Sequence, residues 1–412
     1  MVRPQSPAQP WISACVKHTD RDTVFGFPTS PELPLDGHNL GFLDQRAGLQ
    51  WVQDNIAAFG GSPKKVTIFG ESAGAFSVDA LLTSYPAGSH PPFRGAILES
   101  GQISYNAAPR PYLPSAWANL SAALGCPGNY TTDLACVRAA PAIEIQRIID
   151  VQSLTFNPIA DNITLVSDPA ARRLSGNIAH IPVLGGTNSQ EGRVFTVGQN
   201  NTNAYLATIF GNNSNAIAAV EAAYAIGSPG IHSTYDQIAA IFTDATFQCS
   251  QAEWANATAS IGIPTWRYLF NASFANTQAY PNLGVYHSSE IYIVFGTYPK
   301  DNATTQEVAL STAMMSAWAR FAKNPMGGPG WNEIGTGQAG KVLVGAYDYE
   351  MGGVYAGPQG NVLNGSWDLG LFGNAEDVAS SGVTVIAQQE VDYRCGLWTP
   401  VYEAVSQLSK SS

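Results

Sequence analysis

The chain has no continuous apolar run of about 18 residues, and only 12% of its 412 residues are charged. The first absence argues against a transmembrane helix, which needs about 20 apolar residues. The low charge, together with 45% hydrophobic residues, argues against a disordered chain. The length allows one large α/β domain or two to three smaller ones.

Basic residues are also scarce, because 20 Lys and Arg stand against 31 Asp and Glu, for a net charge of −11. The sequence has no cluster of Lys and Arg that could neutralise the phosphates of a nucleic acid and release their counterions. We therefore expect no nucleic-acid partner and no attraction to an anionic membrane surface.

Sites of the form Asn-x-Ser/Thr are frequent, although a composition rich in Asn and Thr inflates their number. Such sites accept N-glycans in secreted proteins, so their frequency favours secretion. They lie at Asn119, Asn129, Asn162, Asn200, Asn212, Asn256, Asn271, Asn302 and Asn364.

Residues 70–74 read Gly-Glu-Ser-Ala-Gly and directly follow the apolar run 66–69. A G-x-S-x-G pattern alone could arise by chance in a chain with 40 Gly. Here a strand precedes it, and small and apolar residues typical of a helix follow at 75–82. This context predicts a sharp strand-to-helix turn that exposes the hydroxyl of Ser72 above a sheet, with the glycines allowing close approach.

A long stretch around this motif carries a family resemblance. Its segments are residues 39–46, 51–56, 59–63 and 66–75, which follow one another almost without gaps. They resemble the type-B carboxylesterase/lipase family, the cholinesterase-like branch of the α/β-hydrolases, and weaker similarity extends over roughly residues 24–400. The resemblance implies an α/β-hydrolase fold: a mostly parallel central sheet with helices on both faces and cap or lid insertions.

A serine needs a base and a group that orients the base. Of the six histidines, only His287 lies in a segment that resembles the family's histidine loop, residues 284–291. The acid should lie between serine and histidine in chain order. Glu191 follows a strand and a Gly-Gly turn and resembles the family's acid, while Asp161 and Asp168 are rivals by order alone.

The resemblance then implies roles for these residues in ester hydrolysis. Ser72 would attack the carbonyl, His287 would transfer the proton, Glu191 would orient the imidazole, and the Ala73 amide would donate to the oxyanion. Glu71 and Glu290 occupy positions that could tune the imidazolium or hold a water. Alternatively, Glu290 only caps the next helical turn and Glu71 only supports the strand–helix turn.

Cysteines give a second argument for secretion. Cys126 and Cys136 bracket a short polar loop, and Cys249 and Cys395 resemble the family's long-range disulfide, which leaves Cys15 over. Buried free thiols are the alternative to both disulfides.

Regular elements are expected as helices at 43–59 and 308–323 and strands at 95–101, 181–186 and 264–275. The first helix should bury a face of Leu43, Ala47, Trp51, Val52, Ile56 and Phe59. Residues 102–179 and 200–263 are expected to be cap and lid insertions on the C-terminal edge of the sheet.

The N-terminal region departs from the family pattern. No His-Gly-Gly-Gly loop is present, and no charged-then-apolar signal precedes residue 24. We expect a single domain at 24–400 that lacks its N-terminal strands, after an atypical leader at 1–23 and before a tail at 401–412. Such a chain should be poorly soluble and weakly active.

The resemblance therefore predicts a secreted serine hydrolase of small-molecule or lipid esters that uses neither a metal nor a cofactor. The alternative is a weakly active or non-catalytic member of the same fold that acts in binding.

Overall fold

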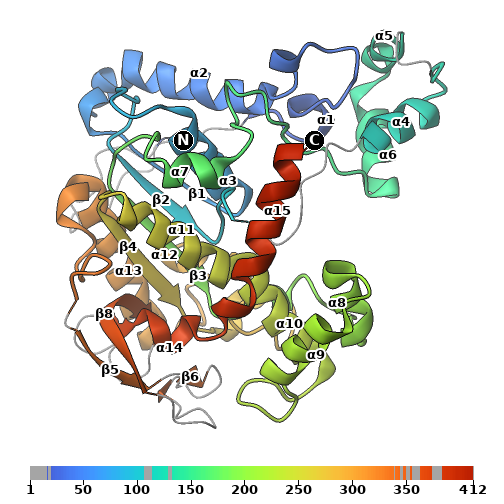
Figure 1. Cartoon of the computed structure of the whole chain (residues 1–412). Coiled ribbons are helices and arrows are strands. Elements are labelled where there is room, and N and C mark those ends of the chain that lie inside the picture. Colours follow the sequence, from blue (N-terminus) through green and yellow to red (C-terminus); the bar gives the residue numbers. More distant parts are fainter. Residues whose placement is uncertain are drawn as a thin grey trace.

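The computed structural model describes residues 16, 20–105, 114–128, 132–337, 339–343, 347–348, 353–354, 362–373 and 383–411. A mostly parallel sheet of seven strands forms its centre, in the order β1-β2-β3-β4-β8-β5, with β9 paired to β8 (Figure 1). Strands β1 to β4 and β8 are parallel, while β5 and β9 pair antiparallel to β8. The strands are β1 Thr67–Glu71, β2 Gly95–Glu99, β3 Val183–Asn188, β4 Thr265–Phe270, β5 Ala339–Leu343, β8 Val362–Phe372 and β9 Thr384–Ala387; a separate pair comprises β6 Tyr347–Asp348 and β7 Gly353–Val354.

Helices cover both faces of the sheet and form two lobes beside it (Figure 1). The longer ones are α2 Leu40–Asn55, α3 Ala73–Ser84, α4 Pro114–Ala123, α6 Ala142–Gln152, α8 Thr202–Phe210, α9 Ser214–Ala223, α10 Thr234–Thr243, α11 Cys249–Ser260, α13 Thr305–Lys323 and α15 Thr399–Ser411. The shorter ones are α1 Thr23–Gly26, α5 Asp133–Ala139, α7 Pro169–Leu174, α12 Ile291–Val294 and α14 Gln388–Asp392.

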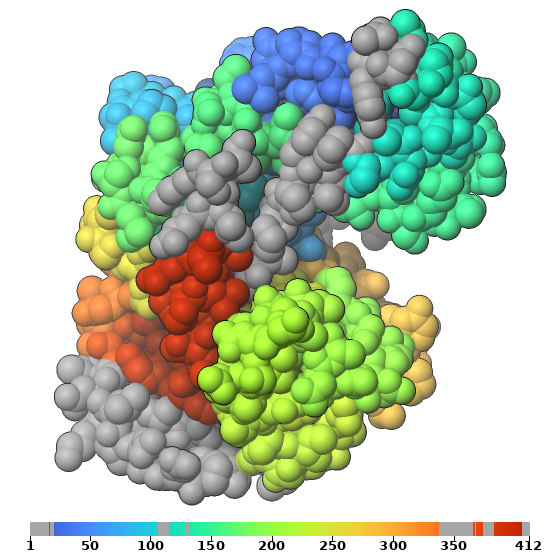
Figure 2. All heavy atoms as spheres, turned by 45° about the vertical axis from the view of Figure 1, so that its right-hand side comes forward, coloured from blue at the N-terminus to red at the C-terminus, as the bar shows by residue number. Residues whose placement is uncertain are grey.

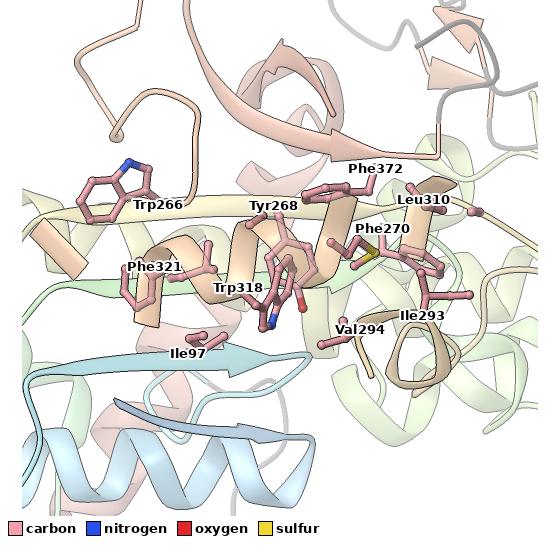
Figure 3. Close-up of a cluster of buried hydrophobic side chains, with 14 of the residues drawn as sticks. Ile97, Trp266, Tyr268, Phe270, Ile293, Val294, Leu310, Trp318, Phe321 and Phe372 are labelled. Atoms are coloured by element: carbon pink, nitrogen blue, oxygen red, sulfur yellow. The ribbon is translucent and has the colours of Figure 1, made fainter. Parts of the chain in front are cut away.

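Successive side chains of β2 point to opposite faces of the sheet and belong to two different core clusters. Ile97 points into a cluster with the aromatic residues of β4 and with α12 and α13, as Figure 3 shows. Ala96 and Leu98 point to the opposite face, where they pack with α3 and α11. A strand that is apolar on both sides is expected in a parallel sheet covered on both faces.

The expected cap and lid segments are partly confirmed as helical lobes and partly corrected. Helices α4 to α6 and helices α8 and α9 form the two lobes, and Figure 2 shows a hollow between them. Helix α11, in contrast, covers the sheet itself, because Trp254 is fully buried against β2 and β3. Its apolar side chains are part of the central core rather than of a lid.

The first long helix also differs from the expectation. Phe42 of α2 is buried, as is Ile56 in the 3-10 turn Ile56–Phe59 that follows the helix, and Leu49 between them is half-buried against the core. Leu43, Trp51 and Phe59, predicted to be core, are 38%, 46% and 57% exposed, and Trp51 packs on Phe59 at the surface. Ala47 is also exposed and Val52 is half-buried, so Ile56 is the one residue of the predicted face that is buried. Sequence spacing alone does not show which of two neighbouring stripes is covered.

Residues on both sides of the predicted domain, in the predicted leader and in the predicted tail, contact the rest of the fold. Arg21, in the predicted leader, forms an ion pair with Asp44 of α2. At the other end, helix α15 covers most of the predicted tail, and Tyr402 is buried against Trp398 and the Cys249–Cys395 disulfide. No helix in the described part of the chain is long and apolar enough to cross a membrane.

Two disulfides are present, Cys126–Cys136 between α4 and α5 and Cys249–Cys395 between α11 and the segment before α15. Cys15 lies outside the described residues. The first disulfide spans 10 residues and the second 146. A longer closed loop removes more conformational freedom from the unfolded chain.

We therefore predict unequal effects of removing the two disulfides. Replacing Cys249 and Cys395 by serine should lower the free energy of unfolding by up to about 5 kcal/mol, and replacing Cys126 and Cys136 by a little under 3 kcal/mol. Urea denaturation of both double variants measures this difference. Equal losses in the two variants would show that the length of the closed loop does not set the effect.

Candidate active site

Ser72 stands at the turn between β1 and α3, in a strained backbone conformation. Its φ is 55° and its ψ is −118°, a region that non-glycine residues rarely adopt. Two glycines make the turn possible, because a Cβ on Gly70 would lie 2.4 Å from the backbone of Gly74 and one on Gly101 would lie 2.6 Å from the Ser72 carbonyl oxygen. The predicted strand–serine–helix turn is therefore present in the structure.

The backbone around Ser72 is fixed by the next strand. The Ser72 N–H donates to the carbonyl oxygen of Glu99, the last residue of β2, at 2.9 Å. Ala73 begins α3, so its amide is one of the first-turn amides that have no acceptor within the helix. An amide in this place can donate to an anion beside Ser72.

Glu191 lies just beyond β3, in a single 3-10 turn at Glu191–Arg193. Its carboxylate is fully buried, and Oε1 accepts the Asn188 N–H at 2.7 Å. Oε2 lies 2.6 Å from Nδ1 of His287. This contact fixes the orientation of the ring and favours the tautomer that carries hydrogen on Nδ1.

His287 lies in the loop between β4 and α12 and is itself buried. Burial lowers its pKa, but the Glu191 carboxylate, through its charge and hydrogen bond, and the Glu71 carboxylate outweigh this effect, so the pKa is raised above its ordinary value. Nε2 makes no hydrogen bond to Ser72 or to any other described group. It lies 3.2 Å from Oε1 of Glu71, close enough for an ion pair although not aligned for a hydrogen bond.

A cluster of three phenylalanines lies on one side of the His287 imidazole, and two of them contact it. The ring centroid of Phe247 lies 4.7 Å from that of His287, and the centroid of Phe195 lies 5.0 Å away. Phe242 stacks on Phe195 and completes the cluster. Phe195 is exposed and Phe247 is buried, so this apolar wall extends from the imidazole to the protein surface. It limits the access of water to the ring from that side.

Two further carboxyl groups, those of Glu99 and Glu290, are buried near the site. Glu99 is paired in register with Glu71 at the ends of β2 and β1, and its Oε1 accepts the Trp318 indole N–H at 2.5 Å. Burial raises the pKa of Glu99 to about 8. Burial and the neighbouring carboxylates, Glu191 first, raise the pKa of Glu290 well above its ordinary value. Burial thus favours the neutral form of both groups, because an uncompensated buried charge is costly.

Glu290 and Glu71, for which both a role near the imidazole and a purely structural role were predicted, have different surroundings. Glu290 makes no capping hydrogen bond to α12; its Oε2 accepts from the Asn188 side chain, and its Oε1 has no partner among the described residues. Glu71 accepts the Ser288 hydroxyl at 2.6 Å and also faces His287. The Glu290 side chain thus does not cap α12, and Glu71 contacts the histidine loop as well as ending β1.

Asp161 and Asp168, the two alternative candidates for the acid, make hydrogen bonds to their own loop or helix. Asp161 accepts the backbone N–H groups of Ile163, Thr164 and Leu165 within its own loop. Asp168 caps helix α7 by accepting the Ala171 N–H. Glu191, in contrast, lies directly against the imidazole of His287.

Sequence reasoning missed Glu99 and the phenylalanine cluster. Glu99 ends an apolar strand without a motif, and only the register with Glu71 brings it to the site. Phe242 and Phe247 lie at the end of α10 and in the π-helical turn Asp244–Gln248, where the departure from α-helical geometry alters the direction of side chains. A local pattern in the sequence does not reveal either arrangement.

A strained serine after a parallel strand, with a histidine and an acid brought to the same edge of the sheet by later strands, defines the α/β-hydrolase class of protein. Residues 16–347 match the Carboxylesterase family, and the chain belongs to this family. Both the family and the fold expected from the sequence are thereby confirmed.

Individual relatives agree with this assignment. The chain is 31% identical to secreted lipase 5 of Gibberella zeae, over 80% of this chain and 62% of that protein. It is 33% identical to secreted lipase 1 of Botryotinia fuckeliana, over 66% of this chain and 53% of that protein. It is 29% identical to chlorogenic acid esterase of Aspergillus niger, over 75% of this chain and 55% of that protein. The chain thus spans between half and two thirds of the length of these curated relatives.

Proposed function

We propose that this protein is a serine hydrolase that cleaves carboxylic esters, from small molecules or lipids, through an acyl-enzyme. The observation that carries the proposal is the 2.6 Å contact between Glu191 and His287 at the sheet edge where the strained Ser72 also lies. Membership of the carboxylesterase family supports ester hydrolysis in general.

In the proposed reaction, Ser72 Oγ attacks the ester carbonyl while His287 Nε2 takes the hydroxyl proton. The Ala73 N–H donates to the oxyanion of the tetrahedral intermediate. The C–O bond to the alcohol then breaks, and His287 returns the proton to the departing alkoxide. Water, deprotonated by the same histidine, attacks the acyl-enzyme, which releases the acid and restores Ser72.

Glu191 would keep Nδ1 protonated and stabilise the imidazolium that forms in each half-reaction. Glu71 would add a second negative charge near the ring, and Glu290, through Asn188, would hold the strand end from which Glu191 projects. The hydrogen bond between Ser72 and His287 would form when substrate binds, because catalytic hydrogen bonds are often incomplete without substrate.

Burst kinetics test the proposal. With an aryl ester such as p-nitrophenyl butyrate, the full chain should release one equivalent of nitrophenol per active site before a slower steady state, if hydrolysis of the acyl-enzyme limits turnover. A butyryl adduct on the protein, found by mass spectrometry after acid quenching, should accompany the burst. Hydrolysis without any acyl adduct would point to direct attack by water instead.

We also propose that the protein is secreted, since two of the relatives are named secreted lipases and the structure contains two disulfides. Protein from a secretory host should then carry N-glycans at several exposed asparagines: Asn119, Asn162, Asn200, Asn212, Asn256 and Asn302.

Asn271 provides an internal control, because it is buried beside β4 and its side chain accepts a hydrogen bond from Ser189. Glycopeptide mapping should find it unmodified. Asn129 lies outside the described residues, and the side chain of Asn364 is not described. Free thiols at all four paired cysteines, with no glycans, would contradict secretion.

A further inference from the structure

Ser288, the residue after His287, has an unusual backbone conformation and a specific contact. Its φ is 72°, a left-handed value that costs energy for any residue with a Cβ. Its hydroxyl donates to Oε1 of Glu71 at 2.6 Å, across a separation of 217 residues. The left-handed turn thus joins the histidine loop to the end of β1, directly beside Ser72.

The same Glu71 oxygen also faces the catalytic side of the imidazole. Oε1 lies 3.2 Å from Nε2 of His287, the nitrogen that would take the proton of Ser72. Nδ1 is already held by Glu191 at 2.6 Å. The ring therefore lies between two carboxylates, with Glu71 on the side of Nε2.

We propose that Ser288 is a positioning residue that latches Glu71 beside Nε2 of His287, so that the ring lies between two carboxylates that favour its protonated form. The latch sets the pH above which His287 can act as a base. This inference rests on the proposed function, because it assigns Nε2 the task of accepting the Ser72 proton.

The other groups around the imidazole do not supply this charge. Glu99, Glu290 and Tyr268 are buried near the two carboxylates. Burial raises the pKa of Glu99 to about 8, and burial with the neighbouring carboxylates raises that of Glu290, which favours the neutral form of both; the pKa of Tyr268 is also raised well above its ordinary value of 10. Glu191 and Glu71 are the two carboxyl groups that lie directly against the ring nitrogens, at 2.6 Å and 3.2 Å.

The sign of the effect follows from the environment of Glu71. Burial raises its pKa, whereas the charge of His287 and the Ser288 hydrogen bond oppose that rise. Removing the hydroxyl raises the pKa of Glu71 and frees its carboxylate to move, so less negative charge faces Nε2. The pKa of His287 then falls, and the neutral imidazole forms at lower pH.

Ser288→Gly tests the latch without a folding penalty, because glycine adopts a left-handed conformation freely. An NMR titration of ¹³C-histidine-labelled full-length protein measures the His287 pKa, with its signal assigned by its loss in His287→Gln. We expect the pKa to fall by about half a unit in Ser288→Gly and by about one unit in Glu71→Gln, as for loss of a nearby opposite charge. In the double variant, the pKa should match that of Glu71→Gln alone.

Ser153→Gly is the matched control, because Ser153 is also a left-handed serine, with φ 51°, but caps the exposed end of α6. It should leave the His287 pKa unchanged. An unchanged or raised pKa in Ser288→Gly would overturn the latch, as would additive shifts in the double variant, since these would mean that Ser288 does not act through Glu71.

The pH dependence of Ser72 labelling by a fluorophosphonate separates this inference from the proposed function. With the latch, the pH at half-maximal labelling rate should move down in Ser288→Gly by the same amount as the His287 pKa. If wild-type Ser72 is not labelled at all, the proposed function fails, and the NMR titration still decides whether the latch exists. If labelling is normal and the pKa does not move, only the latch fails.

Discussion

Replacing Ser72 by alanine should lower kcat for ester hydrolysis by about 10⁵- to 10⁶-fold, the effect of removing the nucleophile of a serine triad. Without Oγ no acyl-enzyme forms, and only attack by water helped by the remaining groups is left. The alanine should fold as well as serine or better, because the Ser72 hydroxyl makes no hydrogen bond with His287. Steady-state kinetics with p-nitrophenyl butyrate measure the loss.

Ser77→Ala is the control for this experiment. Ser77 lies one turn further along α3, and its hydroxyl donates to the Ala73 carbonyl oxygen without contacting His287 or Glu191. Its kcat should stay near that of the wild type. Equal activity of purified Ser72→Ala and wild-type protein would remove Ser72 from the mechanism.

The second large effect concerns the acid. Glu191→Gln should lower kcat by about 10⁴-fold, as does replacing the orienting carboxylate of a serine triad by its amide. An amide can donate a hydrogen to Nδ1, which favours the tautomer with hydrogen on Nε2 and leaves no base for Ser72. It also removes the charge that stabilises the imidazolium. Circular dichroism should show an unchanged fold, because the amide is close to the carboxylate in size.

Asp161→Asn separates this assignment from its rival. Asp161 accepts three backbone N–H groups and the Thr164 hydroxyl, and these contacts hold a loop rather than the imidazole. This variant should lose stability but keep most of its kcat in the folded fraction. Loss of turnover in Asp161→Asn, with activity retained in Glu191→Gln, would reverse the choice of acid.

The sequence predicted those parts of the structure that depend on local chemistry. The glycines at 70 and 74 permit a sharp turn around Ser72, because a Cβ on Gly70 would lie 2.4 Å from the Gly74 backbone, so the motif and its flanking strand and helix indicated that turn directly. The helix expected at 308–323 is likewise present as α13, and its apolar residues Leu310, Met314, Trp318 and Phe321 are buried. In both cases, neighbours in the chain determine the outcome.

Other features depend on contacts between distant segments. Glu99 lies beside Glu71 through strand register, and Ser288 reaches Glu71 from 217 residues away. Trp51 and Leu43 have the spacing of a buried helix face, but the orientation of α2 is set by the elements beneath it. Periodicity shows that a helix has an apolar face, but not how far each residue of that face is covered.

Fluorophosphonate labelling tests the central claim most directly, because it reports an activated serine without depending on the choice of ester. The full-length protein should form one covalent adduct, and tandem mass spectrometry should locate it on Ser72. Labelling should disappear in Ser72→Ala and slow strongly in His287→Gln. A folded wild-type protein that forms no adduct, or forms it on another serine, would contradict the account of this site as a serine esterase.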